Sequence, residues 1–158
     1  VSSSEGVEFV PALAGLGAPH WNPQARGVLC GLTRGTTKAH VARATLEAMA
    51  LQNVDIMEAM QRDLGKRLRS IKVDGGASAN NLLMQLQADY AATEVIRPQI
   101  VESTALGAAY LAGLGIGFWK DADELRKIWK IDQGFKVTMT GKARKDRLER
   151  WAQALKRV

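Results

Sequence analysis

A strand–helix–strand pattern in the middle of the chain limits its possible folds more than any other feature. Residues 69–74 (RSIKVD) and 94–98 (EVIRP) have the composition of strands, and residues 78–92 between them have that of a helix with Ser78 near its N-cap. Pro98 ends the second strand, because proline has no backbone N–H to donate. Strands joined through a helix usually lie parallel in one sheet. The sequence therefore predicts an α/β fold.

Further elements are expected on both sides of this unit. Thr36 or Thr37 is expected to cap a long helix that ends at Gly65, since glycine is common just past a helix C-terminus. Glycine and proline between residues 11 and 27 exclude regular structure there. The other expected elements are strands at residues 7–11, 28–32 and 135–139, and helices at residues 103–117, 121–129 and 141–158.

The long helix has two different faces. Its apolar residues and its polar residues fall on opposite arcs of a helical wheel, and the apolar arc has the spacing of a core-facing side. Leu51 and Val54 lie on the polar arc, which indicates that the helix is covered on more than one side. The apolar arc contains Leu46, Met49, Ala50, Met57, Met60 and Leu64, and the polar arc contains Arg43, Glu47, Asp55, Glu58 and Arg62.

Two later helices differ in composition. Residues 103–117 are rich in glycine and alanine, which allows close approach to a neighbouring backbone, so we expect this helix to be buried. The C-terminal helix is amphipathic and is expected to dock on the domain by its apolar side. That side contains Leu148, Trp151, Ala152 and Leu155.

The chain has 158 residues and 46% hydrophobic content, which suits one ordinary globular domain. Its net charge of +6 arises in residues 120–158, which contain 12 Lys and Arg against 6 Asp and Glu. Few aromatic side chains are interleaved with these charges, so they indicate a solvated basic face. No nucleic-acid partner is expected.

Cysteine and histidine usage excludes several protein classes. Cys30 is the single cysteine, so no internal disulfide framework can form, and with His20 and His40 it gives no zinc-ligand spacing. No secretory signal pattern is visible, and the uncharged residues 103–119 are too few, and too often interrupted by glycine, to span a bilayer. We expect a soluble cytoplasmic protein with no metal site of its own and no membrane partner.

The stretch VDGGASANN, which follows the first strand of the central unit, is the main candidate for a ligand site. The adjacent Gly75 and Gly76 could serve only a tight strand-to-helix turn. They could instead leave room for a flat ligand against the backbone. Ser78 and Asn80 would then offer polar groups beside unpaired N–H donors of the helix start.

No standard phosphate motif accompanies this stretch. The pattern G-x-x-x-x-G-K-[ST] is absent, and GLGAPH and GLGIGF both lack the third glycine of a dinucleotide fingerprint. Asp74 stands at the carboxyl end of a strand, where ligands gather in open α/β sheets. It is expected either to touch a ribose or a metal-bound water, or simply to cap the turn. No base, nucleophile or metal cluster accompanies it.

A resemblance narrows these possibilities. Residues 27–47 (GVLCGLTRGTTKAHVARATLE) resemble a signature of the FGGY carbohydrate kinases, which belong to the actin-like ATPase superfamily. The resemblance implies an actin-like ATPase (ribonuclease H-like) fold, with a mixed sheet flanked by helices. It also implies that residues 1–158 form the C-terminal nucleotide-binding domain of a longer two-domain kinase. The defining positions of the signature are occupied by Gly27, Gly31, His40, Ala44 and Glu47.

Within that family the chain is similar to the glycerol kinases. The similar stretches are FVPALAGLGAPHWNPQARG, VDGGASANN, TALGAAYLAG and GFWKD. Glycerol kinases typically have Tyr and Asp where this chain has His20 and Asn22. These two differences do not change the similarity to glycerol kinases. They bear on the detailed behaviour of the loop that contains both residues.

The resemblance also implies ligands and site residues. In kinases of this family the glycine pair belongs to the adenosine motif, so Gly75, Gly76 and Asn80 are the implied cofactor-binding residues, with Gly76 against the nucleotide and Asn80 near its base. The implied ligands are ATP or ADP, Mg²⁺ held mainly through the nucleotide, and glycerol. The general base and the glycerol-reading residues of the family lie in the preceding N-terminal domain. No catalytic residue is therefore expected here, and the full-length protein is expected to be a homo-oligomer.

Several alternatives stay open. The chain could belong to a xylulokinase-like or gluconokinase-like member of the same family, or to a noncatalytic nucleotide-binding module of actin-like fold. A basic nucleic-acid-binding domain would differ from both by a steep loss of affinity with salt. His40 and Glu47 are expected to organise the domain rather than to catalyse, and Cys30 to be a small core residue in a strand.

Overall fold

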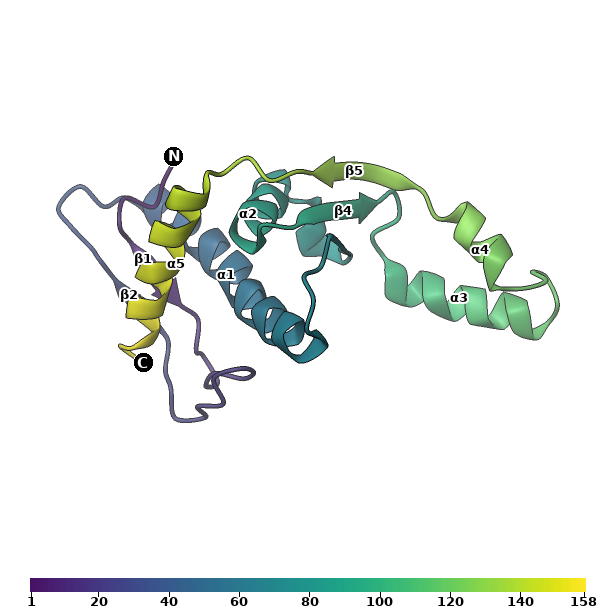
Figure 1. Cartoon of the computed structure of the whole chain (residues 1–158), viewed down its shortest axis with the longest axis horizontal. Coiled ribbons are helices and arrows are strands. Elements are labelled where there is room, and N and C mark those ends of the chain that lie inside the picture. The colour runs from purple at the N-terminus through teal and green to yellow at the C-terminus, as the bar shows by residue number, and fades with distance from the viewer.

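The computed structural model describes residues 1–158 (Figure 1). The chain forms five α-helices and five short strands, with one turn of 3₁₀ helix between β3 and α2. In chain order the elements are β1 (Glu8–Val10), β2 (Val28–Cys30), α1 (Lys38–Leu64), β3 (Ser70–Lys72), η1 (Gly76–Ala79), α2 (Asn81–Ala91), β4 (Glu94–Pro98), α3 (Ser103–Gly115), α4 (Ala122–Ile128), β5 (Ile131–Phe135) and α5 (Gly141–Leu155).

The strands form two separate sheets. β1 and β2 pair antiparallel, with Val10 opposite Val28. In the second sheet β4 is central: β3 lies parallel on one side of it, with Ile71 opposite Val95, and β5 lies antiparallel on the other. The predicted α/β fold, its parallel strand pair and its mixed sheet are confirmed.

Helix α1 begins and ends where the sequence predicts. The backbone N–H of Thr37 donates to Nδ1 of His40 at 3.1 Å, which stabilises the first turn. Gly65 follows the last residue in the left-handed conformation, at φ 63°, which glycine adopts at little cost. Local capping therefore accounts for the length of this helix.

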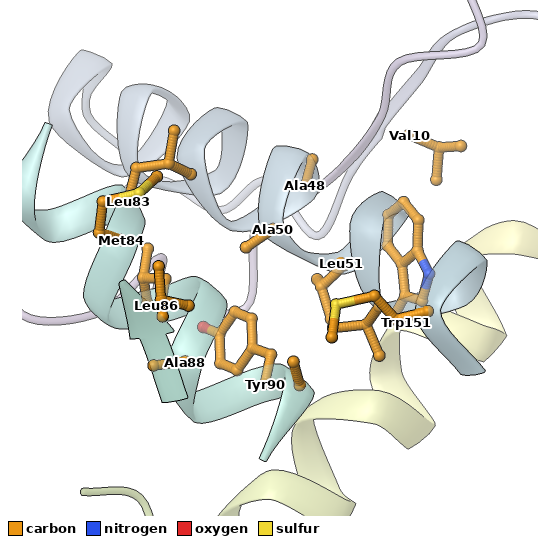
Figure 2. Packing of buried hydrophobic residues seen from close by; sticks show 14 of the residues in the cluster. Val10, Ala48, Ala50, Leu51, Leu83, Met84, Leu86, Ala88, Tyr90 and Trp151 are labelled. Atoms are coloured by element: carbon orange, nitrogen blue, oxygen red, sulfur yellow. The ribbon is translucent and has the colours of Figure 1, made fainter. Parts of the chain in front are cut away.

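The core lies where α1, α2 and α5 meet (Figure 2). Leu51 of α1, Tyr90 of α2 and Trp151 of α5 are each at most 2% exposed, and Val10 of β1 is fully buried. The indole N–H of Trp151 donates to Oδ2 of Asp55 at 2.9 Å, so the one polar atom of this large side chain is satisfied. Residues from both ends of the chain thus share one apolar cluster.

The prediction that α1 is covered on more than one side is confirmed, because Leu51 on its polar arc is fully buried. Glu47 on the same arc is 3% exposed. The core position expected for Met60 and Leu64 is wrong, since they are 50% and 53% exposed. The burial of Glu47 follows from the position of α5, which brings Arg147 to the polar arc of α1. A helical wheel contains no information about that partner.

The C-terminal part of the chain departs from expectation at two further places. Ala152 is exposed, while Ala154 is buried beside Trp151. The expected strand at residues 135–139 is also wrong, since β5 ends at Phe135. The backbone N–H groups of Thr138 and Met139 donate instead to Oδ1 of Asp89, at 2.6 and 3.0 Å. A side chain of α2 therefore takes the donors that a sheet ladder would have used.

Helices α3 and α4 form an arm at one end of the molecule, beyond the adjacent ends of β4 and β5 and far from both termini (Figure 1). The prediction that α3 is buried is wrong, because only Gly113 in it is buried and Leu111 is 73% exposed. The ring of Trp119 meets those of Tyr110 and Phe118 edge to face, at centroid distances of 5.3 and 4.9 Å. These aromatic contacts pack the segment that follows α3 back against that helix.

None of the helices has both the length and the apolar content that crossing a bilayer requires. Cys30 lies in β2, as expected for a strand position, and is partly buried.

Candidate functional site at the ends of two parallel strands

The glycine stretch lies at the carboxyl end of β3, beside the chain that leaves β4. The N–H of Val73 donates to the carbonyl of Ile96 at 3.1 Å, and the N–H of Gly75 donates to that of Val101 at 2.7 Å. The two segments that follow the parallel strands therefore meet at one edge. Ligands of open α/β sheets bind at this kind of edge.

The structure explains glycine at positions 75 and 76 by different physical properties. Gly75 has φ 78° and ψ 166°, a combination that a side chain would strain. Gly76 has no such φ, and a Cβ built on it would meet no atom within 4 Å. The fold therefore requires glycine at Gly75, whereas at Gly76 it leaves open space against bare backbone.

Ser78 and Asn80 are both used within the turn. The hydroxyl of Ser78 donates to the carbonyl of Gly75 at 2.7 Å and is buried. Asn80, rather than Ser78, is the N-cap of α2, and its Oδ1 accepts from the N–H of Leu83 at 3.1 Å. The Nδ2 group of Asn80 makes no hydrogen bond within the chain and is exposed. It is therefore available as a donor beside Gly76.

Asp74 lies at the same edge. Its Oδ2 accepts from the hydroxyl of Ser103, the first residue of α3. This contact favours the structural role for Asp74, because the carboxylate links the turn after β3 to the start of the arm. Asp74 is nevertheless exposed on its other side.

A cavity of about 350 Å³ opens next to the turn, between α1, β3 and α2. Its wall is mostly apolar, with Asp74 and Ser78 at the turn side. Asn53 and Gln87 also line it, and they satisfy each other through a hydrogen bond of 2.9 Å. Pockets of this size with few polar groups suit planar or apolar ligand parts. The main apolar lining residues are Ile56, Met57, Ile71, Val73, Leu83 and Met84.

Sequence reasoning missed Arg97, which supports the turn from the sheet side. Its Nη1 donates to the carbonyl of Ser78 and to Oδ1 of Asn81, both at 2.8 Å. Its Nε donates to Oδ2 of Asp132 at 2.8 Å. The available signal was an arginine inside the apolar strand EVIRP, since a charged residue there needs buried partners.

The signature residues lie elsewhere, with Gly27 and Gly31 on either side of β2 and the others in the first half of α1, and two of them organise the body as expected. His40 caps α1 through Thr37, and Glu47 joins a buried ion cluster with Arg147 of α5. Nε of Arg147 lies 3.1 Å from Oε2 of Glu47, and its Nη2 lies 2.9 Å from Oε2 of Glu8. Arg43 completes the charge balance, with Nε donating to Oε1 of Glu47 at 2.7 Å.

Burial shapes the titration of this cluster. Burial opposes the positive charge on Arg147, but the carboxylates of Glu8 and Glu47 outweigh it and raise the pKa of that guanidinium. Burial also raises the pKa of Glu8, and Arg147 offsets only part of this effect. The Oε2 atom of Glu8 makes no aligned hydrogen bond, which fits a carboxylate that is incompletely stabilised.

The loop residues that depart from the glycerol kinase pattern both have partners. Nε2 of His20 lies 2.9 Å from Oδ2 of Asp55, the atom that also accepts from Trp151. Oδ1 of Asn22 accepts from the N–H groups of Gln24 and Ala25, at 3.0 and 3.1 Å. His20 thus anchors the loop to α1, and Asn22 closes its turn.

Comparison with known proteins assigns the family. Residues 1–116 match the model of the C-terminal domain of the FGGY family of carbohydrate kinases. The chain belongs to this family. Members of it with solved structures share the fold: a gluconate kinase from Lactobacillus acidophilus is 25% identical with a TM-score of 0.75, covering 97% of this chain and 30% of that one. The chain thus has the actin-like ATPase fold that the signature implied.

Two glycerol kinases are more similar. That of Bdellovibrio bacteriovorus is 70% identical over 158 residues, which is all of this chain and 32% of that protein. The crystal structure of Plasmodium falciparum glycerol kinase with ADP has a TM-score of 0.89 and 35% identity, covering 99% of this chain and 31% of that one. The chain spans about a third of the length of these FGGY relatives.

Proposed function

We propose that this chain is the nucleotide-binding C-terminal part of a glycerol kinase, which transfers the γ-phosphate of ATP to glycerol and gives glycerol 3-phosphate. The observation that carries the proposal is the 70% identity to a glycerol kinase along the whole chain. The gluconate kinase, by contrast, is 25% identical, so a sugar-acid substrate has weaker support. A nucleotide ligand is supported by the ADP of the similar Plasmodium enzyme.

Three residues of the glycine turn form the proposed nucleoside site. The open backbone at Gly76 receives the flat face of adenosine, and the free Nδ2 of Asn80 donates to an acceptor at its edge. Gly75 supplies the backbone conformation that positions Gly76 and Asn80. The packing of the chain does not require glycine at position 76, and the proposed nucleoside site explains why glycine is found there.

The remaining parts of the reaction are assigned to the N-terminal domain of the full-length enzyme. Phosphoryl transfer depends on positioning and on electrostatic stabilisation of the moving phosphoryl group. No group of three or more His, Cys, Asp or Glu side chains in this chain is placed to hold a metal ion. In this proposal Mg²⁺ would be held mainly by the nucleotide phosphates and by the N-terminal domain. The isolated chain should not phosphorylate glycerol.

The test is the Michaelis constant for ATP of the full-length enzyme carrying Gly76→Val. The added side chain fills the space assigned to adenosine, so we expect a rise in this constant and almost no change in the constant for glycerol. Asn80→Ala should act in the same direction by about threefold to tenfold, as the loss of one neutral hydrogen bond predicts.

The control is Gly141→Val, because a Cβ at Gly141 also meets open space but lies at the start of α5. Melting temperatures without nucleotide should match the parent for Gly76→Val. An unchanged ATP constant in Gly76→Val would remove adenosine from this turn. A full-length protein that does not phosphorylate glycerol would refute the proposed activity itself. Sedimentation of the same protein tests the predicted homo-oligomer.

A further inference from the structure

The side chain of Arg97 connects two segments that are remote in sequence. It projects from the end of β4 and is 11% exposed. One side of its guanidinium faces the glycine turn, through the carbonyl of Ser78 and Oδ1 of Asn81. The other side faces β5, where Nη2 lies 2.7 Å from Oδ2 of Asp132 and donates to Oε1 of Gln133 at 3.2 Å.

These contacts require the geometry of arginine. A planar guanidinium presents several N–H groups in fixed directions, whereas a lysine ammonium is a compact charge on a flexible stem. The guanidinium carbon of Arg97 also lies 5.3 Å from the centroid of the Phe135 ring, which supports one face of the group. Asp132 balances the charge and leaves the neutral acceptors of the turn free to set its position.

Along the glycine turn, residues that Arg97 holds alternate with residues that face open space. Arg97 holds Ser78 and Asn81, while the space where a Cβ of Gly76 would lie is open and the amide nitrogen of Asn80 makes no hydrogen bond within the chain. Arg97 itself makes no contact with the open side of Gly76. It can therefore affect a ligand there only through the position of the turn.

We propose that Arg97 is a positioning residue for nucleotide binding, which fixes the glycine turn against β5 through Asp132. The inference rests on the proposed function, since it requires a nucleotide at Gly76. It adds a contribution from β5, a segment outside residues 1–116 that the family model matches. Nucleotide affinity thus depends on residues that never touch the nucleotide.

The experiment compares Arg97→Lys and Asp132→Asn in the full-length enzyme, with Asp146→Asn as control. Asp146 forms an ion pair with Lys142 on the exposed side of α5 and has no contact with the turn. We expect the Michaelis constant for ATP to rise about tenfold in Arg97→Lys, which loses hydrogen bonds of a charged group, and about threefold in Asp132→Asn. The turnover number and the constant for glycerol should stay within about twofold of the parent, because these bonds act at the nucleotide site.

A second readout is the preference for ATP over GTP. A turn that is held loosely should discriminate less between bases, so this preference should fall in Arg97→Lys and stay unchanged in Asp146→Asn. A purely structural role would lower the melting temperature and leave both the ATP constant and the base preference at parental values. That result would overturn the inference.

Failure of the inference and failure of the proposed site are distinguishable. If Gly76→Val raises the ATP constant and Arg97→Lys does not, only the role of Arg97 is refuted. If neither variant changes it, the nucleotide site at the turn is refuted together with this inference. Should Arg97→Lys fail to fold, Asp132→Asn decides, because Asp132 is 46% exposed and asparagine still offers a side-chain oxygen to the guanidinium of Arg97. An unchanged ATP constant in that folded variant overturns the inference.

Discussion

Two buried arginines hold two regions of this molecule, and their partners differ. The side chain of Arg147 is 4% exposed, and its partners Glu8 and Glu47 are 8% and 4% exposed. Arg97 is also nearly buried, but its carboxylate partner Asp132 is 46% exposed. The first region is a closed ionic core, whereas the second is a support beside open space. An arginine thus stabilises the core in one region, and another arginine supports the candidate site in the other.

The origin of the partners explains the difference. Arg147 in α5 joins Glu8 of β1 and Glu47 of α1, which are 139 and 100 positions away. It therefore connects the two ends of the body. Arg97 instead holds the backbone carbonyl of Ser78 and the amide of Asn81, both within the turn. Changes around Arg147 should alter stability, and changes around the turn should alter binding.

The largest expected effect is that of Arg147→Met in the full-length protein. Removing Arg147 leaves the buried Glu8 with only the exposed Arg150 nearby and leaves Glu47 with Arg43 alone, which costs about 3–5 kcal/mol of the free energy of unfolding. Urea unfolding of the purified variant measures it. Any folded fraction should keep the parental Michaelis constant for ATP, since the cluster is remote from the turn.

The matched control is Arg150→Met on the same helix. Arg150 lies 3.6 Å from Oε1 of Glu8 but is 56% exposed, so its ion pair is worth less than about 1 kcal/mol. Equal losses in the two variants would show that burial of the guanidinium does not set the stability of this region.

The second prediction separates the two glycines by stability alone. Gly75→Ala should lower the free energy of unfolding by about 1–3 kcal/mol, because its backbone conformation strains any side chain. Gly76→Ala should change it by less than about 1 kcal/mol, since the added Cβ meets no atom. Urea unfolding without nucleotide checks both. A large loss in Gly76→Ala would mean that the turn, not a ligand, requires this glycine.

The smallest effect concerns Tyr90, which packs under Arg147. Burial raises the pKa of its phenol above the usual 10.0, and Glu47 adds to this shift. The folded protein therefore keeps the phenolic proton at pH values where the unfolded chain has begun to lose it. Stability contributed by the neutral phenol is complete below pH 10 and decreases as the pH rises above it.

Tyr90→Phe removes this group and keeps the ring. Thermal melts between pH 9 and 11 should show a steeper alkaline decrease in the parent than in the variant, by the linkage of proton binding to unfolding. Identical slopes would show that the phenol titrates alike in the folded and unfolded chains.

Local signals in the sequence were sufficient for much of the fold and for part of the site. Thr37 and Gly65 bound α1 correctly, and the pattern RSIKVD, SANNLLMQ and EVIRP gave the parallel strand pair. VDGGASANN placed the glycine turn at the end of β3. Each of these features depends on residues that are close in the sequence, so propensity and periodicity contain the information. The nucleotide role of Gly75, Gly76 and Asn80 was suggested by the family resemblance and remains a prediction.

Only the tertiary structure decided which polar side chains are buried and what they hold. Glu47 lies on the polar arc of α1, and α5 covers it with Arg147, 100 positions away. Asp89 ends the sheet at Phe135 because it binds the N–H groups of Thr138 and Met139. Arg97 reaches Asp132 across 35 positions. A buried charge is stable only with its partner, and a partner this distant leaves no mark in local composition; the sequence alone therefore determined the elements and the turn, and the folded chain determined what fixes the turn in place.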